Sequence, residues 1–343
     1  MQNPPKLATI DFIYKLVLPV CFAFLKEVNK KARDTGLTPY FMSRDGYIPS
    51  KLYRRYFGHC EYFYFSRRVA SSLLYASRDY SKKHLEIFLS LHRFSGTLSQ
   101  FVLNRLPPGV CQSDGWDYSF EIETTRDHGR DYLLDFIQKK TPEILEKSFE
   151  VKRCLTSYLD RLKAPDQWLI VDIGVYGTAQ AVLQLLLERE LNSLYLCGSH
   201  DNPWKLKNYH YLIDLIDSNY KLWSALLECA LTAPHGTVTG FDDSGTPTFG
   251  RISENMKQIS HFENMLNESA QSYVPTVDAV PSQNLIRTAL TFCNTLSQYS
   301  GSDDFLELLF TLENDFVRPN QPEKKIELYS NSKRNVQQGG KDS

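Results

Sequence analysis

One segment, residues 168–190, constrains the fold of this chain more than any other. It opens with WLIV at 168–171, which is apolar on both faces of an extended chain and is typical of a central strand in a parallel sheet. A loop with two glycines follows, and residues 178–190 then have the apolar spacing of a helix. A buried strand that turns through glycines into a helix predicts an α/β fold.

The same order of strand, polar loop and helix occurs twice near the N-terminus. The runs TPYFM at 38–42 and YFYF at 62–65 predict strands, and helical spacing follows each of them. We expect further strands at 194–197 and 211–213, and a hairpin arm at 236–241 with a turn at 242–245. Together these segments predict a Rossmann-like, mostly parallel sheet.

Between the two groups of strands, residues 81–163 are more polar and mostly helical in pattern, with loops at 107–109 and 113–115. We predict a single α/β domain over residues 1–330, with 81–163 as a helical insertion and a helical C-terminal part that extends to about residue 318. The polar tail, 331–343, is expected to be disordered.

Residues 12–25 are apolar enough to raise the question of a membrane anchor. The run is only about fourteen residues long, against the roughly twenty that a bilayer span needs, and it contains Lys15 and Pro19. It also lacks the charged start and cleavage site of a secretory signal. We expect a buried helix, no transmembrane segment, and a cytoplasmic protein that can associate peripherally with the inner membrane.

Charge and cysteine content exclude several classes of protein. The net charge of −1 gives no overall attraction to nucleic acid. The seven cysteines include no Cys-x-x-Cys pair, and their number is odd. Scattered thiols of this kind indicate reduced cysteines, not a disulfide framework or a zinc site.

The first candidate site follows the strand at 38–42. Ser43, Arg44, Asp45 and Gly46 stand at a strand-to-helix turn, and ligands of α/β sheets bind outside the carboxyl ends of strands. Arg44 could hold a phosphate through two hydrogen bonds, and Asp45 could bind a metal, a sugar hydroxyl or an acceptor proton. The alternative is structural: Ser43 or Asp45 caps the helix, and Arg44 pairs with a surface carboxylate.

Arg67 and Arg68 take the corresponding place after the second strand. Two adjacent arginines are often only a solvated surface. Their position one strand-helix unit after Arg44 nevertheless favours at least one of them as a ligand of the same crevice.

The loop after 168–171 has the features of a phosphate-binding loop. An acid, Asp172, ends the strand, Gly174 and Gly177 free the backbone, and Thr178 opens the helix. No lysine follows the second glycine, so the loop is not a Walker motif, and it lacks the Gly-x-Gly-x-x-Gly spacing. It partly matches the ribose-phosphate loop of ordinary phosphoribosyltransferases. A tight turn without a ligand is the alternative.

Two further observations bear on the chemistry. Glu228 and His235 lie seven residues apart and could act in acid–base catalysis, although each could equally be a hydrogen-bonded structural residue. No two aspartates are spaced Asp-x-Asp. That pair serves phosphatases of the haloacid dehalogenase type and many nucleotide-sugar transferases, so both classes lose support.

Taken in order, the segments 41–46, 64–67, 172–180 and 228–236 resemble one family. It is the second domain of bacterial dual-domain ribofuranosyltransferases, whose first domain is a haloacid-dehalogenase-like phosphatase and which occur among surface-polysaccharide genes such as those for O-antigen or capsule. The resemblance extends from about residue 16 to about residue 249. Within the 343 residues we expect no counterpart of that phosphatase domain. The resemblance places in the site a set of residues from all four segments: Arg44, Asp45, Arg67, Asp172, Tyr176, Gly177, Thr178, Gln180 and Glu228.

The resemblance implies a glycosyltransferase that moves a 5-phosphoribosyl group from phosphoribosyl pyrophosphate to a hydroxyl of a glycan acceptor, which could be lipid-linked. A separate phosphatase would remove the 5-phosphate, or the product would keep it. Asp172 or Asp45 could stabilise the oxocarbenium-like charge, and Asp45 or Glu228 could deprotonate the acceptor. A bound Mg²⁺ could neutralise the leaving group, although the missing acidic pair leaves the metal open.

Two other functions remain open from the sequence. One is a sugar-phosphate phosphohydrolase, which would release inorganic phosphate without any glycan acceptor. The other is a non-catalytic subunit that binds phosphosugars in a polysaccharide assembly complex, in which replacing Asp45 or Asp172 would leave polymer synthesis intact.

Overall fold

The structure is a computed structural model that describes residues 10–296, except for a set of short gaps at 78–80, 93, 111, 113, 125–126, 215–226, 229, 251–255 and 278. The predicted tail at 331–343 and the helix expected beyond residue 296 lie outside the described residues. The chain divides into two compact units that are interleaved along the sequence, and the single domain expected over 1–330 stays a prediction. Unit 1 comprises 1–62, 214–236 and 251–343, and unit 2 comprises 63–213 and 237–250.

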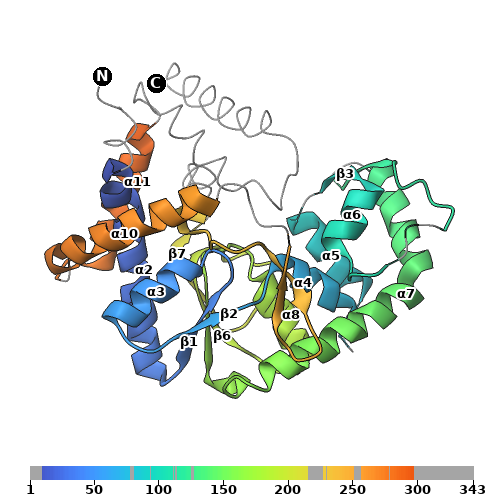
Figure 1. Cartoon of the computed structure of the whole chain (residues 1–343), viewed down its shortest axis with the longest axis horizontal. Coiled ribbons are helices and arrows are strands. Elements are labelled where there is room, and N and C mark those ends of the chain that lie inside the picture. Colours follow the sequence, from blue (N-terminus) through green and yellow to red (C-terminus); the bar gives the residue numbers. More distant parts are fainter. Residues whose placement is uncertain are drawn as a thin grey trace. The chain divides into compact units, whose positions relative to one another are not determined.

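The main sheet has five strands in the order β2-β1-β5-β6-β7 (Figure 1). These strands are β1 (Thr38–Met42), β2 (Glu61–Phe63), β5 (Trp168–Asp172), β6 (Asn192–Gly198) and β7 (Tyr209–Asp214). The sheet is parallel and has helices around it, which confirms the predicted Rossmann-like α/β fold. Each predicted strand of the sheet is present, and β1 has the predicted bounds.

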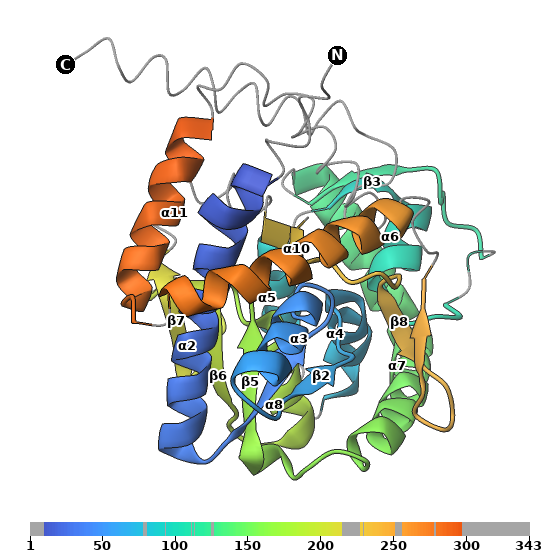
Figure 2. The same ribbon diagram turned by 60° about the vertical axis from the view of Figure 1, so that its left-hand side comes forward.

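Unit 1 is built around a buried helix. A π-helical turn, Ile13–Val17, leads into α2 (Leu18–Thr35), and ten of the residues of α2 are buried. Helices α10 (Met256–Val277) and α11 (Ser282–Leu296) pack against this pair (Figure 2). Helix α3 (Tyr47–Tyr56) contacts β1. The apolar run near the N-terminus is therefore a core helix, as predicted.

Unit 2 contains the centre of the sheet. The side chains of Trp168, Leu169, Ile170 and Val171 in β5 are fully buried, which agrees with the prediction of a central strand. Strand β5 pairs in parallel with β6, and Asp172 lies opposite Tyr195. Two helices, α8 (Thr178–Leu187) and α4 (Arg67–Leu73), pack against each other. Because β5 and β6 are parallel, their carboxyl ends lie at the same edge of the sheet.

The predicted helical insertion consists of α5 (Lys82–Leu91), α6 (Leu98–Arg105) and α7 (Asp127–Leu159). It also contains a small antiparallel sheet of β3 (Ser95–Thr97) and β4 (Glu121–Glu123). The sequence did not indicate these strands, because three residues are too few to establish an alternating pattern. The short 3-10 helices Leu74–Ala76 and Pro165–Gln167 connect neighbouring elements.

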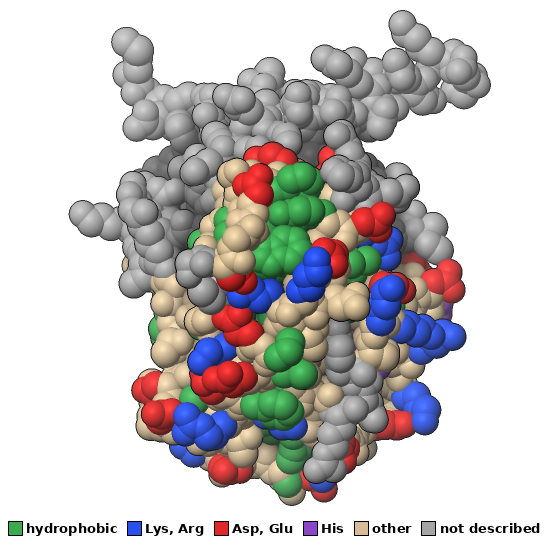
Figure 3. Space-filling model, turned by 90° about the vertical axis from the view of Figure 1, so that its right-hand side faces the viewer, with side chains coloured by type: hydrophobic (Ala, Val, Ile, Leu, Met, Phe, Trp, Pro, Cys, Tyr) green, Lys and Arg blue, Asp and Glu red, His purple; other side chains and the backbone are tan. Residues whose placement is uncertain are grey.

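The hairpin of unit 2 is β8 (Val238–Phe241) and β9 (Pro247–Phe249). Its turn is closed by hydrogen bonds from Gly245 N to Asp242 O and from Asp242 N to Thr246 O, as the sequence predicts for 242–245. On the face drawn in Figure 3, acidic and basic side chains are interspersed over the described residues. This face therefore has no large block of a single charge among the described residues.

Candidate functional site

The β5–α8 loop is held in shape by its own acid and by a glycine. The carboxylate of Asp172 accepts a hydrogen bond from Gly174 N–H at 3.1 Å, which turns the chain as it leaves the strand. Gly177 then adopts φ +65°, a left-handed conformation that disfavours other residues, and it forms the N-cap of α8. The glycine at 177 is therefore required by the backbone itself.

The loop between β6 and β7 braces this turn. Asn202 Nδ2 donates to Tyr176 O at 3.1 Å, and the Tyr209 hydroxyl donates to Val175 O at 2.6 Å. These contacts fix the backbone that precedes α8. A hollow lies beside these contacts. It is lined by residues of the β6–β7 loop and of β7: Ser199, His200, Asp201, Asn202, Pro203, Lys205, Leu206, Tyr209 and Tyr211. The sequence analysis missed this loop, although it follows the carboxyl end of a predicted strand.

The hydroxyl of Thr178 already has protein partners. Its Oγ1 lies 2.8 Å from Nε2 of His92, the residue that ends α5, and it accepts a hydrogen bond from Trp204 Nε1 at 3.3 Å. Both His92 and Thr178 are buried. Burial, reinforced by the charges of Arg67 and Arg105, holds the pKa of His92 well below its usual value, so this imidazole is neutral. His92 was not among the residues predicted for the site.

Asp172 and Arg67 interact electrostatically at the start of the loop. Burial raises the pKa of the Asp172 carboxyl above its usual value, although the Gly174 N–H and the charge of Arg67 oppose the shift. Arg67 is exposed, while Asp172 is half-buried. Burial raises the pKa values of Tyr195 and Tyr209, and the charge of the Asp172 carboxylate adds to both shifts. The site thus pairs a poorly solvated acid with a solvent-facing cation.

Two predicted residues of unit 2 have clear structural partners. Gln180 is fully buried, its Nε2 donates to Leu191 O at 2.8 Å, and its Oε1 accepts from Tyr195 at 3.3 Å. It joins α8 to the sheet, and we leave it out of the proposed ligand set. Arg68 is half-buried beside the exposed Arg67, and burial lowers its pKa. Tyr176 is exposed at the loop surface.

The turn at 43–46 in unit 1 lacks the helix cap that the structural alternative expected. Helix α3 begins after Gly46, and no side chain caps it. Arg44 Nη2 donates to Thr232 Oγ1 at 2.8 Å. Gly46 N–H donates to Met42 O at 2.9 Å, and a Cβ on Gly46 would collide with that carbonyl oxygen. Packing against β1 therefore explains this glycine without a ligand.

The buried hydroxyl of Ser43 has no hydrogen-bond partner among the described residues. Asp45 and Glu228 are half-buried. Both belong to unit 1, and their predicted roles as base or stabiliser stay predictions.

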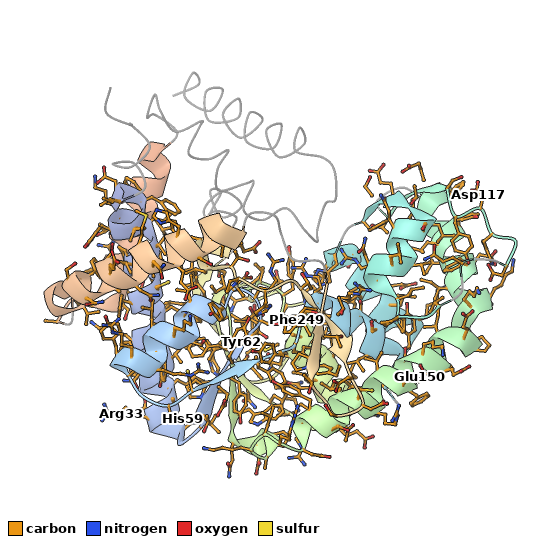
Figure 4. All side chains as sticks on the ribbon, viewed as in Figure 1. Arg33, His59, Tyr62, Asp117, Glu150 and Phe249 are labelled. Carbon is orange, nitrogen blue, oxygen red and sulfur yellow. The ribbon has the colours of Figure 1, made fainter. Side chains whose placement is uncertain are left out.

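His235 forms a small polar group within unit 1. Its Nδ1 donates to Gly236 O at 2.8 Å, so Nε2 is the acceptor for the Tyr62 hydroxyl, also at 2.8 Å (Tyr62 is labelled in Figure 4). Burial, together with the charge of Arg44, lowers the pKa of His235, although the bond to Gly236 opposes this. His235 and Arg44 are therefore electrostatic neighbours.

Within the described part of the chain, no three His, Cys, Asp or Glu side chains gather as a metal site. None of the described helices combines the length and apolarity that a membrane crossing needs. No protein-family model matches this chain, and no curated protein matches it either.

Proposed function

We propose that this protein is a glycosyltransferase of surface-polysaccharide biosynthesis that transfers a 5-phosphoribosyl group from phosphoribosyl pyrophosphate to a glycan hydroxyl. The observation that carries the proposal is the position of Asp172 on the turn that leads into the N-terminus of α8, where it interacts electrostatically with Arg67. A phosphorylated sugar offers negative oxygens to a cation and a helix N-terminus, and hydroxyls to a carboxylate. The resemblance to ribofuranosyltransferases supports the same donor.

The reaction needs one bond made and one broken. The acceptor oxygen forms a bond to the anomeric carbon, the bond from that carbon to pyrophosphate breaks, and pyrophosphate leaves with the electron pair. The acceptor proton passes to a carboxylate. Asp172 suits the stabilisation of positive charge at the ring, because a carboxylate with little water around it interacts strongly with a developing cation.

The proposal includes Mg²⁺ only as an ion that would bind together with the pyrophosphate group of the donor. Mg²⁺ commonly keeps several waters and binds through substrate phosphates with one or two carboxylates, and Asp172 is the carboxylate at this loop. Bound there, the ion would neutralise charge on the leaving pyrophosphate. Assays with and without EDTA would measure the dependence.

The test is incubation with phosphoribosyl pyrophosphate, Mg²⁺ and synthetic glycan acceptors, followed by mass spectrometry. We expect acceptors to gain one phosphopentose unit, and Asp172→Asn to lose this activity while it remains folded. Failure to form product with varied acceptors, together with no donor binding in calorimetry, would overturn the proposal. Release of inorganic phosphate from sugar phosphates without any acceptor would favour a phosphohydrolase instead.

A further inference from the structure

A second cation of unit 2, Arg105, lies buried near the β5–α8 loop. It ends α6 in the helical insertion, and only 4% of its surface is exposed. Its Nε and Nη1 atoms have no hydrogen-bond partner among the described residues. Burial, followed by the charge of Arg67, lowers the pKa of Arg105 to about 9. Burying a guanidinium with unsatisfied N–H groups is costly unless an anion compensates it.

Arg105 belongs to a group of cations and N–H donors. The charges of both Arg67 and Arg105 lower the pKa of His92, and His92 Nε2 lies 2.8 Å from Thr178 Oγ1 at the first residue of α8. Helix α8 has ten residues, and its first N–H groups and partial positive charge favour an anion. Four elements thus contribute to one electropositive cluster: α4 with Arg67, the end of α5 with His92, α6 with Arg105 and α8 with Thr178, and α4 contacts both α6 and α8.

The geometry points to a binding site for a phosphate monoester, formed by Arg67 and Arg105 beside the His92–Thr178 corner at the N-terminus of α8. An arginine keeps its proton in proteins, so an anion, and not deprotonation, would compensate the buried charge of Arg105. Arg67 is exposed and Arg105 is buried, so an anion would enter past Arg67 and displace solvent from it. Two guanidinium groups suit a dianion with three terminal oxygens.

This inference deepens the proposed function, because it names the residues that would hold the phosphate of the donor sugar. It depends on Arg105 and His92, which the sequence analysis did not select. The helical insertion would then take part in ligand binding within unit 2, because the ends of α5 and α6 supply His92 and Arg105.

The test measures binding of inorganic phosphate to the full chain by calorimetry and by the rise in Tm. Arg105→Gln and Arg67→Gln should each weaken phosphate binding at least tenfold. Arg189→Gln, at an exposed arginine just beyond α8, is the matched control and should bind as the wild type does. In phosphate-free buffer, Arg105→Gln should unfold at the same temperature as the wild type or higher, because a buried charge has been removed.

Competition separates a sugar phosphate from the free anion. Ribose 5-phosphate should displace phosphate, whereas ribose should not. The inference fails if the wild type does not bind phosphate, if Arg189→Gln loses binding equally, or if both site variants bind within twofold of wild type. Should Arg105→Gln not fold, the exposed Arg67→Gln decides. If the protein binds phosphate but transfers no glycosyl group, only the proposed function is contradicted. If it transfers the group but Arg67→Gln and Arg105→Gln bind phosphate as the wild type does, only this binding site is contradicted.

Discussion

The hydroxyl of Thr178 at the start of α8 lies 2.8 Å from Nε2 of His92 at the end of α5. Trp204, from the loop after β6, donates to the same oxygen. One hydroxyl therefore connects the sheet edge, the insertion and the β6–β7 loop of unit 2. Its position at a helix N-terminus makes the connection relevant to ligand binding as well as to stability.

Removing that hydroxyl should destabilise the protein. Thr178→Val keeps the shape of the side chain but leaves a buried imidazole and an indole N–H without their partner, which should cost about 1–3 kcal/mol of unfolding free energy. Denaturant unfolding measures the change. Thr178→Ser retains the oxygen and should recover most of the loss. If valine were tolerated as well as serine, the hydrogen bond would contribute nothing measurable.

Neutral His92 should make stability depend on pH. Its pKa lies well below the usual 6.5, so the stability it contributes is present above pH 6.5 and is lost as the pH falls toward the lowered pKa. The Tm of the wild type should therefore drop between about pH 6.5 and 5. His92→Gln should make this profile less steep, with part of the remaining slope due to His235, whereas His59→Gln, at an exposed position, should keep the wild-type shape. A wild-type slope in His92→Gln would contradict the prediction.

Gly177 should be more sensitive to substitution than a glycine of similar conformation elsewhere. Gly36 has φ +70° with no atom near the place of a Cβ, while at Gly177, with φ +65°, a Cβ would press on Leu206. Alanine should cost about 1 kcal/mol at both positions for the left-handed backbone, and more at 177 for the contact. Equal losses of unfolding free energy in the two variants would show that Leu206 moves freely.

The sequence predicts elements well where one local pattern determines them. The run 168–171 is buried on both faces, and β1 has the predicted bounds, because hydrophobic periodicity and flanking turns agree there. Thr178 opens α8 as expected. The glycine at 46 shows the limit of this approach. Its residue type suggested close approach to a ligand, but the nearest neighbour is the carbonyl of Met42, which only the folded backbone reveals.

The candidate site was also predictable only in part, because local sequence patterns do not show which distant residues meet in the folded chain. Asp172, Arg67 and Thr178 follow strands or open helices, so their place at the sheet edge can be inferred from the chain. His92 and Arg105 end helices of the insertion, and nothing in their local sequence indicates a common partner. They reach Thr178 and Arg67 through tertiary packing, which a single sequence does not encode locally. The contacts of Asn202 and Trp204 could have been expected, since their loop follows β6.

Asp172→Asn should separate stability from activity. The raised pKa means that ionising this carboxyl opposes folding: its favourable contribution is full below pH 3.8 and is lost as the pH rises through the raised pKa. Asparagine has no charge and still accepts from Gly174. At neutral pH the variant should melt a few degrees higher, since ~1 kcal/mol shifts Tm by about 2–4 °C in a domain of this size. This increase in Tm should become smaller toward pH 4.

The transfer activity of Asp172→Asn should fall on the order of 10²-fold or more, because the developing positive charge loses its carboxylate. Melting curves across pH and the mass-spectrometric assay measure the two effects, and a variant with full activity would remove Asp172 from the chemistry.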